Sequence, residues 1–231
     1  MIKFEKTYVF GWEAAIRGMR NPMNSWDMSD SYYGMVEDPS PINPDDWAYI
    51  ILGENDLKLM KSLSKAGSDH GKFLRFINVT VDITAPLYWW KEFDTYKVGT
   101  VANSCSTMHK IHDKPFTSDD FSFDEELFDL DIDLPGKDEF LHTHGFMLVD
   151  YVTFHCENLR QMYLKTKDKR YWRLLIQFLP TSYNQKRTVQ LNYQVLKSMY
   201  FARRHHKLDE WREFCTWCES LPYFKEICIQ E

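Results

Sequence analysis

The clearest pattern along this chain is a strict alternation of apolar and polar residues between positions 77 and 84. Every second position is apolar: Ile77, Val79, Val81 and Ile83. The positions between them are polar: Asn78, Thr80, Asp82 and Thr84. A period of two is typical of a β-strand that buries one face. The pattern predicts a half-buried strand that ends at Pro86, followed by a short helix over residues 87–96.

Elsewhere apolar residues recur at helical spacing. Residues 55–67 predict a helix that Asn55 caps, with Gly67 following its last turn. Residues 147–165 predict a longer helix with one apolar stripe. The members of that stripe are Leu148, Tyr151, Val152, His155, Leu159, Met162 and Tyr163.

Three further helices are predicted towards the end of the chain, over residues 169–179, 191–203 and 209–220. Ser182 and Gln185 offer a capping box for the helix that holds residues 191–203. Together the elements predict an α+β fold, in which a small, mostly antiparallel sheet is covered by helices.

Two segments lack a regular pattern. Residues 19–48 are rich in Pro, Asn, Asp and Ser, which predicts mostly loop. Residues 119–140 are strongly acidic, and they are interpreted either as a solvated surface excursion or as a partner-binding or subunit-capping loop. The second interpretation rests on apolar residues between the charges: Phe121, Phe123, Leu127, Phe128, Leu130 and Ile132. The length of 231 residues suits a single domain with an acidic insertion at about 119–140.

Composition narrows the class of protein. Hydrophobic residues make up 44% and aromatic residues 16%, which is typical of a globular chain. The net charge of −6 argues against binding of a nucleic-acid polymer but permits a mononucleotide site. No apolar run reaches the roughly 18 residues that a membrane span needs, and the first residues do not resemble a secretion signal. Five scattered cysteines favour free thiols, so we expect a cytoplasmic protein without membrane contact.

Isolated motifs for catalysis or metal binding are weak. Cys215 and Cys218 stand three apart near His205 and His206, but no second cysteine pair exists, so packing is favoured over a zinc site. We therefore expect no metal. Cys105 is conceivable as a nucleophile, and a small buried cysteine is the favoured interpretation.

Residues 70–108 resemble, without gaps, the core of the flavin-dependent thymidylate synthases. Anchoring on Ala85-Pro86 places the sequence Thr95-Tyr96-Lys97 on the family's Arg-His-Arg signature. A second block, Leu179-Pro180 followed twelve residues later by Asn192, has the family's spacing. The resemblance implies the fold of that family, a bound FAD, a homotetramer, and pockets that lie between subunits.

The resemblance also implies roles for individual residues. The residues that fall on flavin-contacting positions or on the altered signature are His70, Tyr96, Lys97, Asn192, Gln194 and Ser198. Tyr96 falls on the histidine of the family's signature and, like it, has a ring that can stack or form a hydrogen bond. Lys97 falls on the second arginine and has a positive charge, but it cannot form the paired hydrogen bonds of a guanidinium. The residues that fall on or near substrate-contacting positions are Thr100, Asn103, Cys105, Arg203 and Arg204. Arg203 matches the family's arginine that binds and polarises the uracil ring, and Arg204 is the alternative for this role.

The positions that hold the nucleotide phosphate in the family are changed. Glu92 replaces a glutamine, Cys105 a serine, Thr107 an arginine and Ile176 another arginine. Each charge-assisted hydrogen bond contributes roughly 1.5–3 kcal/mol, so the loss of two or three costs several kcal/mol. We therefore expect that dUMP is not held in the family's way.

Three functions remain open from the sequence. The first is methyl transfer to a uracil nucleotide with FAD, and with NADPH and methylenetetrahydrofolate as co-substrates, around a remodelled phosphate site. The second is a flavin- or folate-using enzyme that acts on a different nucleotide or base. The third is a non-catalytic oligomer that binds a ligand or a partner.

Overall fold

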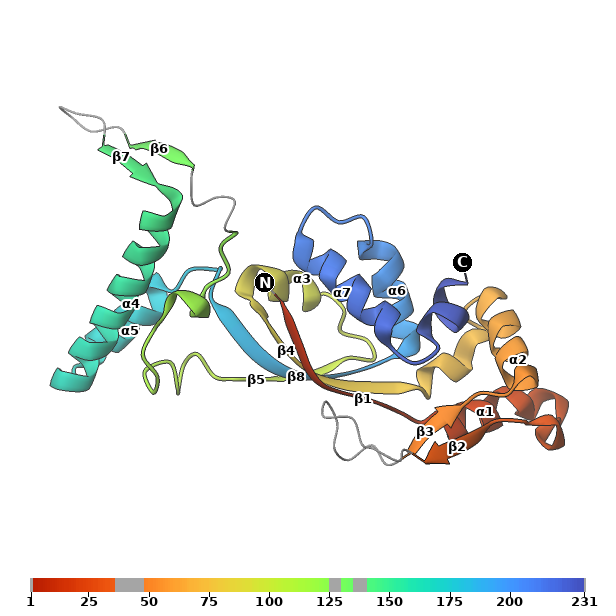
Figure 1. The fold of residues 1–231 in the computed structure, drawn as a ribbon. Helices are drawn as coiled ribbons and strands as arrows, with labels where there is room; N and C mark the ends of the chain where they lie inside the picture. The colour runs from red at the N-terminus through yellow and green to blue at the C-terminus, as the bar shows by residue number, and fades with distance from the viewer. Residues whose placement is uncertain (1, 36–47, 125–129, 135–140, 231) are drawn as a thin grey trace. The chain divides into compact units, whose positions relative to one another are not determined.

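The alternating segment forms the strand β4 (Asn78–Pro86) of a four-stranded sheet in the computed structural model (Figure 1). The structure describes residues 2–35, 48–124, 130–134 and 141–230. The small antiparallel sheet has the strand order β1-β4-β8-β5. Its other strands are β1 (Lys3–Phe10), β5 (Val101–Ser104) and β8 (Asn184–Asn192). Along β4, buried Val79, Val81 and Ile83 alternate with half-buried polar residues, which confirms the predicted strand.

The chain folds into two compact units. Unit 1 comprises Thr84–Phe93 and Ser104–Lys186, and unit 2 comprises Ile2–Ile83, Asp94–Asn103 and Arg187–Glu231. The strands β4 and β8 each run from one unit into the other. The single domain expected from chain length stays a prediction.

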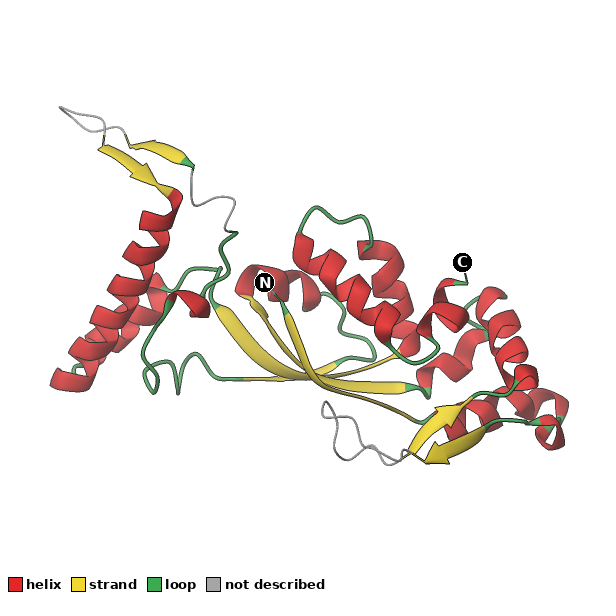
Figure 2. Cartoon of the chain, viewed as in Figure 1, coloured by secondary structure: helices red, strands yellow, loops and turns green. Residues whose placement is uncertain are grey.

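Unit 2 carries helices around its part of the sheet (Figure 2). Its α-helices are α1 (Trp12–Arg20), α2 (Glu54–Lys65), α6 (Tyr193–Arg203) and α7 (Asp209–Ser220). Its short helical turns are η1 (Asn21–Met23), η2 (Trp26–Met28), η3 (Gly71–Arg75) and the π-helix η6 (Lys225–Ile229). A separate antiparallel hairpin pairs β2 (Tyr32–Met35) with β3 (Ala48–Ile51). Helix α6 packs against both α7 and η3, and the backbone N–H of Tyr193 at its start donates to the carbonyl oxygen of Ile77 over 3.0 Å.

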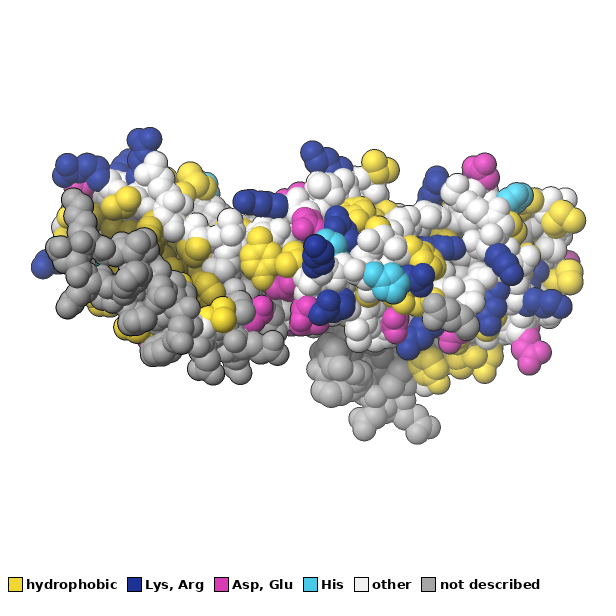
Figure 3. Space-filling model, turned by 90° about the horizontal axis from the view of Figure 1, so that it is seen from above, with side chains coloured by type: hydrophobic (Ala, Val, Ile, Leu, Met, Phe, Trp, Pro, Cys, Tyr) yellow, Lys and Arg dark blue, Asp and Glu magenta, His cyan; other side chains and the backbone are white. Residues whose placement is uncertain are grey.

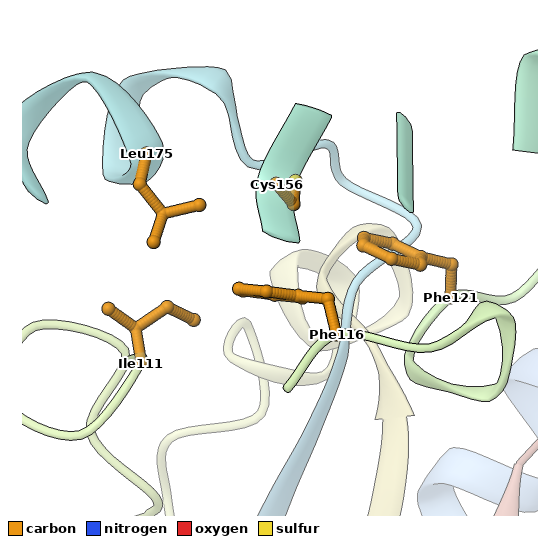
Figure 4. Close-up of a cluster of buried hydrophobic side chains, with 5 residues drawn as sticks. All are labelled: Ile111, Phe116, Phe121, Cys156 and Leu175. Atoms are coloured by element: carbon orange, nitrogen blue, oxygen red, sulfur yellow. The ribbon is translucent and has the colours of Figure 1, made fainter. Parts of the chain in front are cut away.

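Unit 1 has its own hydrophobic cluster, which Figure 4 shows in close-up. Its elements are α3 (Leu87–Phe93), η4 (Ser118–Asp120), α4 (Gly145–Thr166), α5 (Lys169–Phe178) and the antiparallel pair β6 (Asp131–Leu134) and β7 (Leu141–His144). The helices α4 and α5 pack along each other. Between them and the preceding loop lies the cluster of Ile111, Phe116, Phe121, Cys156 and Leu175. Burial in this cluster raises the pKa of the Cys156 thiol to about 12, which keeps it protonated and inert.

A buried ion pair ties α1 to α2 within unit 2. The guanidinium of Arg20 donates from Nε to Oδ1 of Asp56 over 2.7 Å, and the two side chains are 3% and 0% exposed. Arg20 also donates to the carbonyl oxygens of Ser25 and Met28. Oδ2 of Asp56 accepts from the hydroxyls of Ser29 and Ser31, each over 2.7 Å. Because the pair is hydrogen-bonded on both sides, it fixes the connection between α1 and β2.

Several helix boundaries differ from those predicted. Asn55 lies inside α2, which begins at Glu54, and the carboxylate of Asp30 accepts from the backbone N–H groups of Asn55 and Asp56. A carboxylate distant in sequence therefore replaces the predicted cap. Gly67 has φ +103°, which confirms its place after the end of the helix. Helix α3 ends at Phe93, earlier than the predicted residue 96.

The predicted capping box at Ser182 and Gln185 is wrong, because residues 184–192 form β8. Helix α6 begins only at Tyr193, and its cap is Asn192, whose side chain accepts from the N–H of Val195 over 3.0 Å. The helices over residues 169–179 and 209–220 are confirmed to within one residue.

The predicted apolar stripe of α4 is wrong in part. Its members Leu148, Tyr151 and Met162 are exposed, whereas Val149, Cys156 and Arg160 are buried. Arg160 is buried because it donates to both carboxylate oxygens of Glu157 and to the carbonyl oxygen of His112. A charged side chain with three partners can occupy the inner face of a helix, which an apolar count along the sequence misses.

The two segments without a pattern contain more structure than expected. Residues 19–48 include the end of α1, two 3₁₀ turns and β2, so the prediction of mostly loop holds only in part. In the acidic segment, Phe121 is buried in the cluster of unit 1 and bridges to Tyr183, so a wholly solvated excursion is wrong at its start. Leu130 is exposed. Leu127, Phe128 and the side chain of Ile132 lie outside what the structure describes.

Candidate functional site

Arg203 at the end of α6 lies against two aromatic rings in unit 2. Its Nε donates to the hydroxyl of Tyr96 over 2.9 Å. Its guanidinium carbon lies 4.6 Å from the centre of the Trp211 ring and 5.6 Å from that of Tyr96. The two rings meet edge to face with centroids 6.2 Å apart. This arrangement, named here the arginine cage, restricts the guanidinium and adds cation–π attraction to the two rings.

The arginine cage joins residues that were assigned to different ligands. Tyr96 was predicted on the flavin side, and Arg203 on the substrate side. Trp211 was not among the predicted site residues. The available signal was the pair Glu210-Trp211, which resembles, displaced by one residue, a Gln-Trp pair that follows the uracil-binding arginine in the flavin-dependent thymidylate synthases. The guanidinium carbon of Arg204 instead lies 5.1 Å from the centre of the Phe201 ring. The two arginines therefore have different aromatic neighbours.

A tight turn at Gly99 and Thr100 lies against the start of α6. Gly99 has φ +76°, and a Cβ there would come within 3.0 Å of Val195 and 3.2 Å of the Asn192 side chain. Only glycine allows this close approach. The hydroxyl of the following Thr100 is buried, and no described residue forms a hydrogen bond with it. A buried hydroxyl without a partner costs free energy, so this turn has a polar atom available for a ligand.

Other predicted flavin residues gather near the same end of α6. A Cβ on Gly71, which follows His70, would lie 3.8 Å from Oε1 of Gln194. Ser198 is exposed one turn along α6 and donates to the carbonyl oxygen of Gln194. Lys97 is exposed on the segment between Tyr96 and Gly99. Figure 3 shows Lys and Arg side chains spread over one face of the molecule. The exposed cations of unit 2 include Lys61, Lys65, Lys72 and Arg75.

The predicted substrate residues are divided between the two units. Thr100 and Asn103 belong to unit 2, where Asn103 is exposed on β5. Cys105 belongs to unit 1, and the expectation that it is buried is wrong, because it is an exposed free thiol. Its backbone is nevertheless held: its N–H donates to the carbonyl oxygen of Lys186, and its own carbonyl accepts from Gln185.

The positions that match the family's phosphate ligands all lie in unit 1. Ile176 is half-buried and packs against the hydrophobic cluster of Figure 4. Glu92 is half-buried on α3, and Thr107 is half-buried in the loop after β5. None of Glu92, Cys105, Thr107 and Ile176 provides a cation. These side chains cannot neutralise a phosphate.

The remaining cysteines are structural. Cys215 and Cys218 are both buried on α7, and burial raises the pKa of Cys215 to about 11 and that of Cys218 well above its usual range. The part of the chain that the structure describes contains no group of three or more His, Cys, Asp or Glu side chains able to hold a metal ion. None of its described helices has the length and apolar character to cross a membrane.

The fold defines a class: it is the fold of the flavin-dependent thymidylate synthases. Thymidylate synthase X from Helicobacter pylori, solved with FAD and dUMP, matches with a TM-score of 0.64 and 14% identity over 100% of this chain and 98% of that one. A UMP/dUMP methylase from Streptomyces cacaoi, bound to 5-Br dUMP, matches with a TM-score of 0.60 and 14% identity over 100% and 95% of the two chains. No protein-family model matches the sequence, and no curated protein matches it significantly.

Proposed function

We propose that this protein binds FAD and transfers a methyl group to a uracil nucleotide, with a phosphate site that differs from that of its structural neighbours. The arginine cage carries the proposal. A guanidinium whose position is restricted by the Tyr96 hydroxyl and by two rings is pre-positioned to polarise a carbonyl-bearing base, and such positioning lowers the barrier without a protein nucleophile. Arg203 is the proposed catalytic residue.

The residues around the start of α6 fit a flavin. Gly99 brings this turn into close contact with Val195 and Asn192, and the Thr100 hydroxyl beside it has no hydrogen-bond partner among the described residues. His70, Asn192, Gln194 and Ser198 border the same end of the helix and would hold the ring system or its ribityl chain. Lys97 would neutralise a phosphate of the cofactor. Bound there, FAD would supply the hydride, and NADPH and methylenetetrahydrofolate are the proposed co-substrates.

A second candidate is supported by unit 1. Ile176 packs against a hydrophobic cluster and Glu92 is negative, so the positions that match the phosphate ligands disfavour a dianion. This favours a flavin- or folate-using enzyme whose substrate is a different nucleotide, a nucleoside or a free base. We also propose that the protein assembles as a homotetramer. The third candidate function is a non-catalytic oligomer that binds a ligand or a partner.

The first test is the absorbance spectrum of the purified protein. A flavin spectrum, or its appearance on reconstitution with FAD, is expected. NADPH oxidation with dUMP, UMP, deoxyuridine and uracil as substrates then separates the first candidate from the second. A colourless protein that takes up no FAD would contradict the first candidate and the flavin-using form of the second, and would leave a folate-using enzyme or the non-catalytic role.

The arginine cage predicts the effect of Tyr96→Phe. The substitution keeps the ring and removes the hydroxyl that accepts from Arg203, so we expect kcat for the preferred uracil substrate to fall about 5–10-fold, the effect of one hydrogen bond to a charged group. The midpoint of thermal unfolding should stay nearly unchanged. Steady-state kinetics on both proteins provide the measurement.

The matched control is Tyr32→Phe, because Tyr32 is 60% exposed and lies on the hairpin β2–β3. It should leave kcat and KM unchanged. If Tyr96→Phe instead lowers the unfolding midpoint and leaves kcat intact, the cage has only a structural role.

A further inference from the structure

A cavity in unit 2 shares no described lining residue with the site around α6. Its volume is about 670 Å³, within the range of roughly 300–1,000 Å³ that is typical of small-molecule sites. It lies between β1, the hairpin β2–β3, and the chain from the end of α7 to η6. Eight of its fifteen described lining residues are aromatic, which is far above the 16% aromatic share of the chain.

One wall depends on a break in the alternation of β1. In a regular strand, side chains three residues apart point to opposite faces. Trp217 nonetheless contacts both Phe4 and Thr7: its ring stacks on Phe4 with centroids 4.7 Å and planes 5° apart, and its Nε1 donates to the Thr7 hydroxyl over 3.1 Å. Lys6 between them has φ 51°, a left-handed conformation that costs about 1–2 kcal/mol for a residue with a Cβ. The strand therefore holds a strained residue that turns both side chains towards Trp217.

The hairpin provides the opposite wall. Gly34 pairs with Tyr49, and a Cβ at Gly34 would lie 3.0 Å from Cζ of Tyr49. The absence of that Cβ lets the Tyr49 ring lie across the strand. Tyr8, Tyr33 and Tyr49 are 43%, 49% and 52% exposed, so their rings border an open mouth. Exposed rings of this kind can stack on the face of a planar ligand.

The charge on the described residues that line the cavity determines which planar ligands it favours. Glu226 is the only charged side chain among the described residues that line it. The indole N–H of Trp217 is already donated to Thr7, and the Tyr223 hydroxyl already accepts from the backbone N–H of Leu52. A carboxylate beside aromatic faces attracts cations and N–H donors and repels phosphates.

We propose that this cavity binds a planar aromatic heterocycle of purine size or larger, neutral or cationic, whose ring stacks on the tyrosines and whose N–H groups face Glu226. The volume, the two aromatic walls and the lone carboxylate together define this ligand class. The site is independent of the proposed flavin and uracil sites, so it would add a second ligand to the protein.

The test is titration of the full chain with proflavine, a planar tricyclic cation with two amino groups, followed by its fluorescence. Saturable binding at one site per chain is expected, and it should persist with saturating FAD. Tyr49→Ala should weaken it by about tenfold or more, since stacking on one ring contributes roughly 1–3 kcal/mol. Glu226→Gln, which keeps the side-chain shape, should weaken it about 3–10-fold.

Two controls make the outcome decisive. Tyr151→Ala removes a tyrosine of similar exposure, 56%, from unit 1 and should leave proflavine binding unchanged. Fluorescein, a planar anion, should bind at least about tenfold more weakly than proflavine because of Glu226. Absence of saturable binding, equal affinity in Tyr49→Ala, displacement by FAD, or equal affinity for fluorescein would each overturn the proposal.

Discussion

Replacing Asp56 with alanine is expected to lower the free energy of unfolding by about 3–5 kcal/mol, because it leaves the Arg20 guanidinium buried without its counter-ion. Arg20 is 3% exposed and Asp56 is fully buried, so water cannot take over the lost contacts. The hydroxyls of Ser29 and Ser31 lose their acceptor as well. Urea unfolding followed by circular dichroism provides the measurement.

The loss of stability at low pH provides a second test of the ion pair between Arg20 and Asp56. Burial raises the pKa of Asp56, but hydrogen bonds from Ser31, Ser29 and Arg20 outweigh it, so the pKa lies below its usual value. A depressed carboxyl pKa contributes stability above the unfolded value of about 3.9, and that contribution is lost as pH falls through the folded value. The native protein should therefore lose this stability below about pH 4, whereas Asp56→Ala has none of it to lose.

The matched control for this variant is Asp69→Ala, because Asp69 is an exposed acid of the same unit. It should change the free energy of unfolding by less than about 0.5 kcal/mol. Two results would mean that the pair contributes no more than a surface ion pair. One is a loss of less than about 1 kcal/mol in the free energy of unfolding of Asp56→Ala. The other is that stability falls at low pH in Asp56→Ala as it does in the unaltered protein.

Removal of the phosphate from dUMP is expected to change its affinity for this protein by less than about threefold. A site with two or three charge-assisted hydrogen bonds to a phosphate would favour dUMP over deoxyuridine by on the order of 10³-fold. Glu92, Cys105, Thr107 and Ile176 offer no cation for such bonds. Calorimetric titration of the FAD-loaded protein with dUMP and deoxyuridine measures the difference.

Glu92→Gln isolates the electrostatic part of that expectation. It restores a neutral amide at the position of the negative side chain, so dUMP affinity should rise about 3–10-fold while deoxyuridine affinity stays constant. Preference of the unaltered protein for dUMP by a hundredfold or more would show that other residues hold the phosphate.

The elements that the sequence predicted well are those whose own residues determine their burial. The strand β4 alternates because one face meets the core, and α7 follows from its own apolar spacing. The strand β8 was missed because polar residues dominate it: only Gln185, Val189 and Leu191 are buried. Gln185 is buried through a hydrogen bond to the carbonyl oxygen of Cys105, eighty positions away, which no local pattern reveals.

The candidate site was predictable to a similar extent. The family resemblance located Tyr96, Asn192 and Arg203, but the arginine cage depends on Trp211 meeting Tyr96 across more than a hundred positions. The close contact of Gly99 with Val195 and Asn192, and the buried hydroxyl of Thr100, likewise depend on how the turn meets α6. Tertiary contacts of this kind give the adjacent arginines Arg203 and Arg204 different aromatic neighbours, which the sequence alone does not reveal.

Because Cys105 is exposed, its thiol provides the protein with a single site for labelling with thiol-reactive reagents. Of its five free thiols, Cys105 alone is exposed, and burial raises the pKa of the other four, to about 12 for Cys228 as for Cys156. A maleimide dye should thus label one position, in unit 1, without any engineered cysteine.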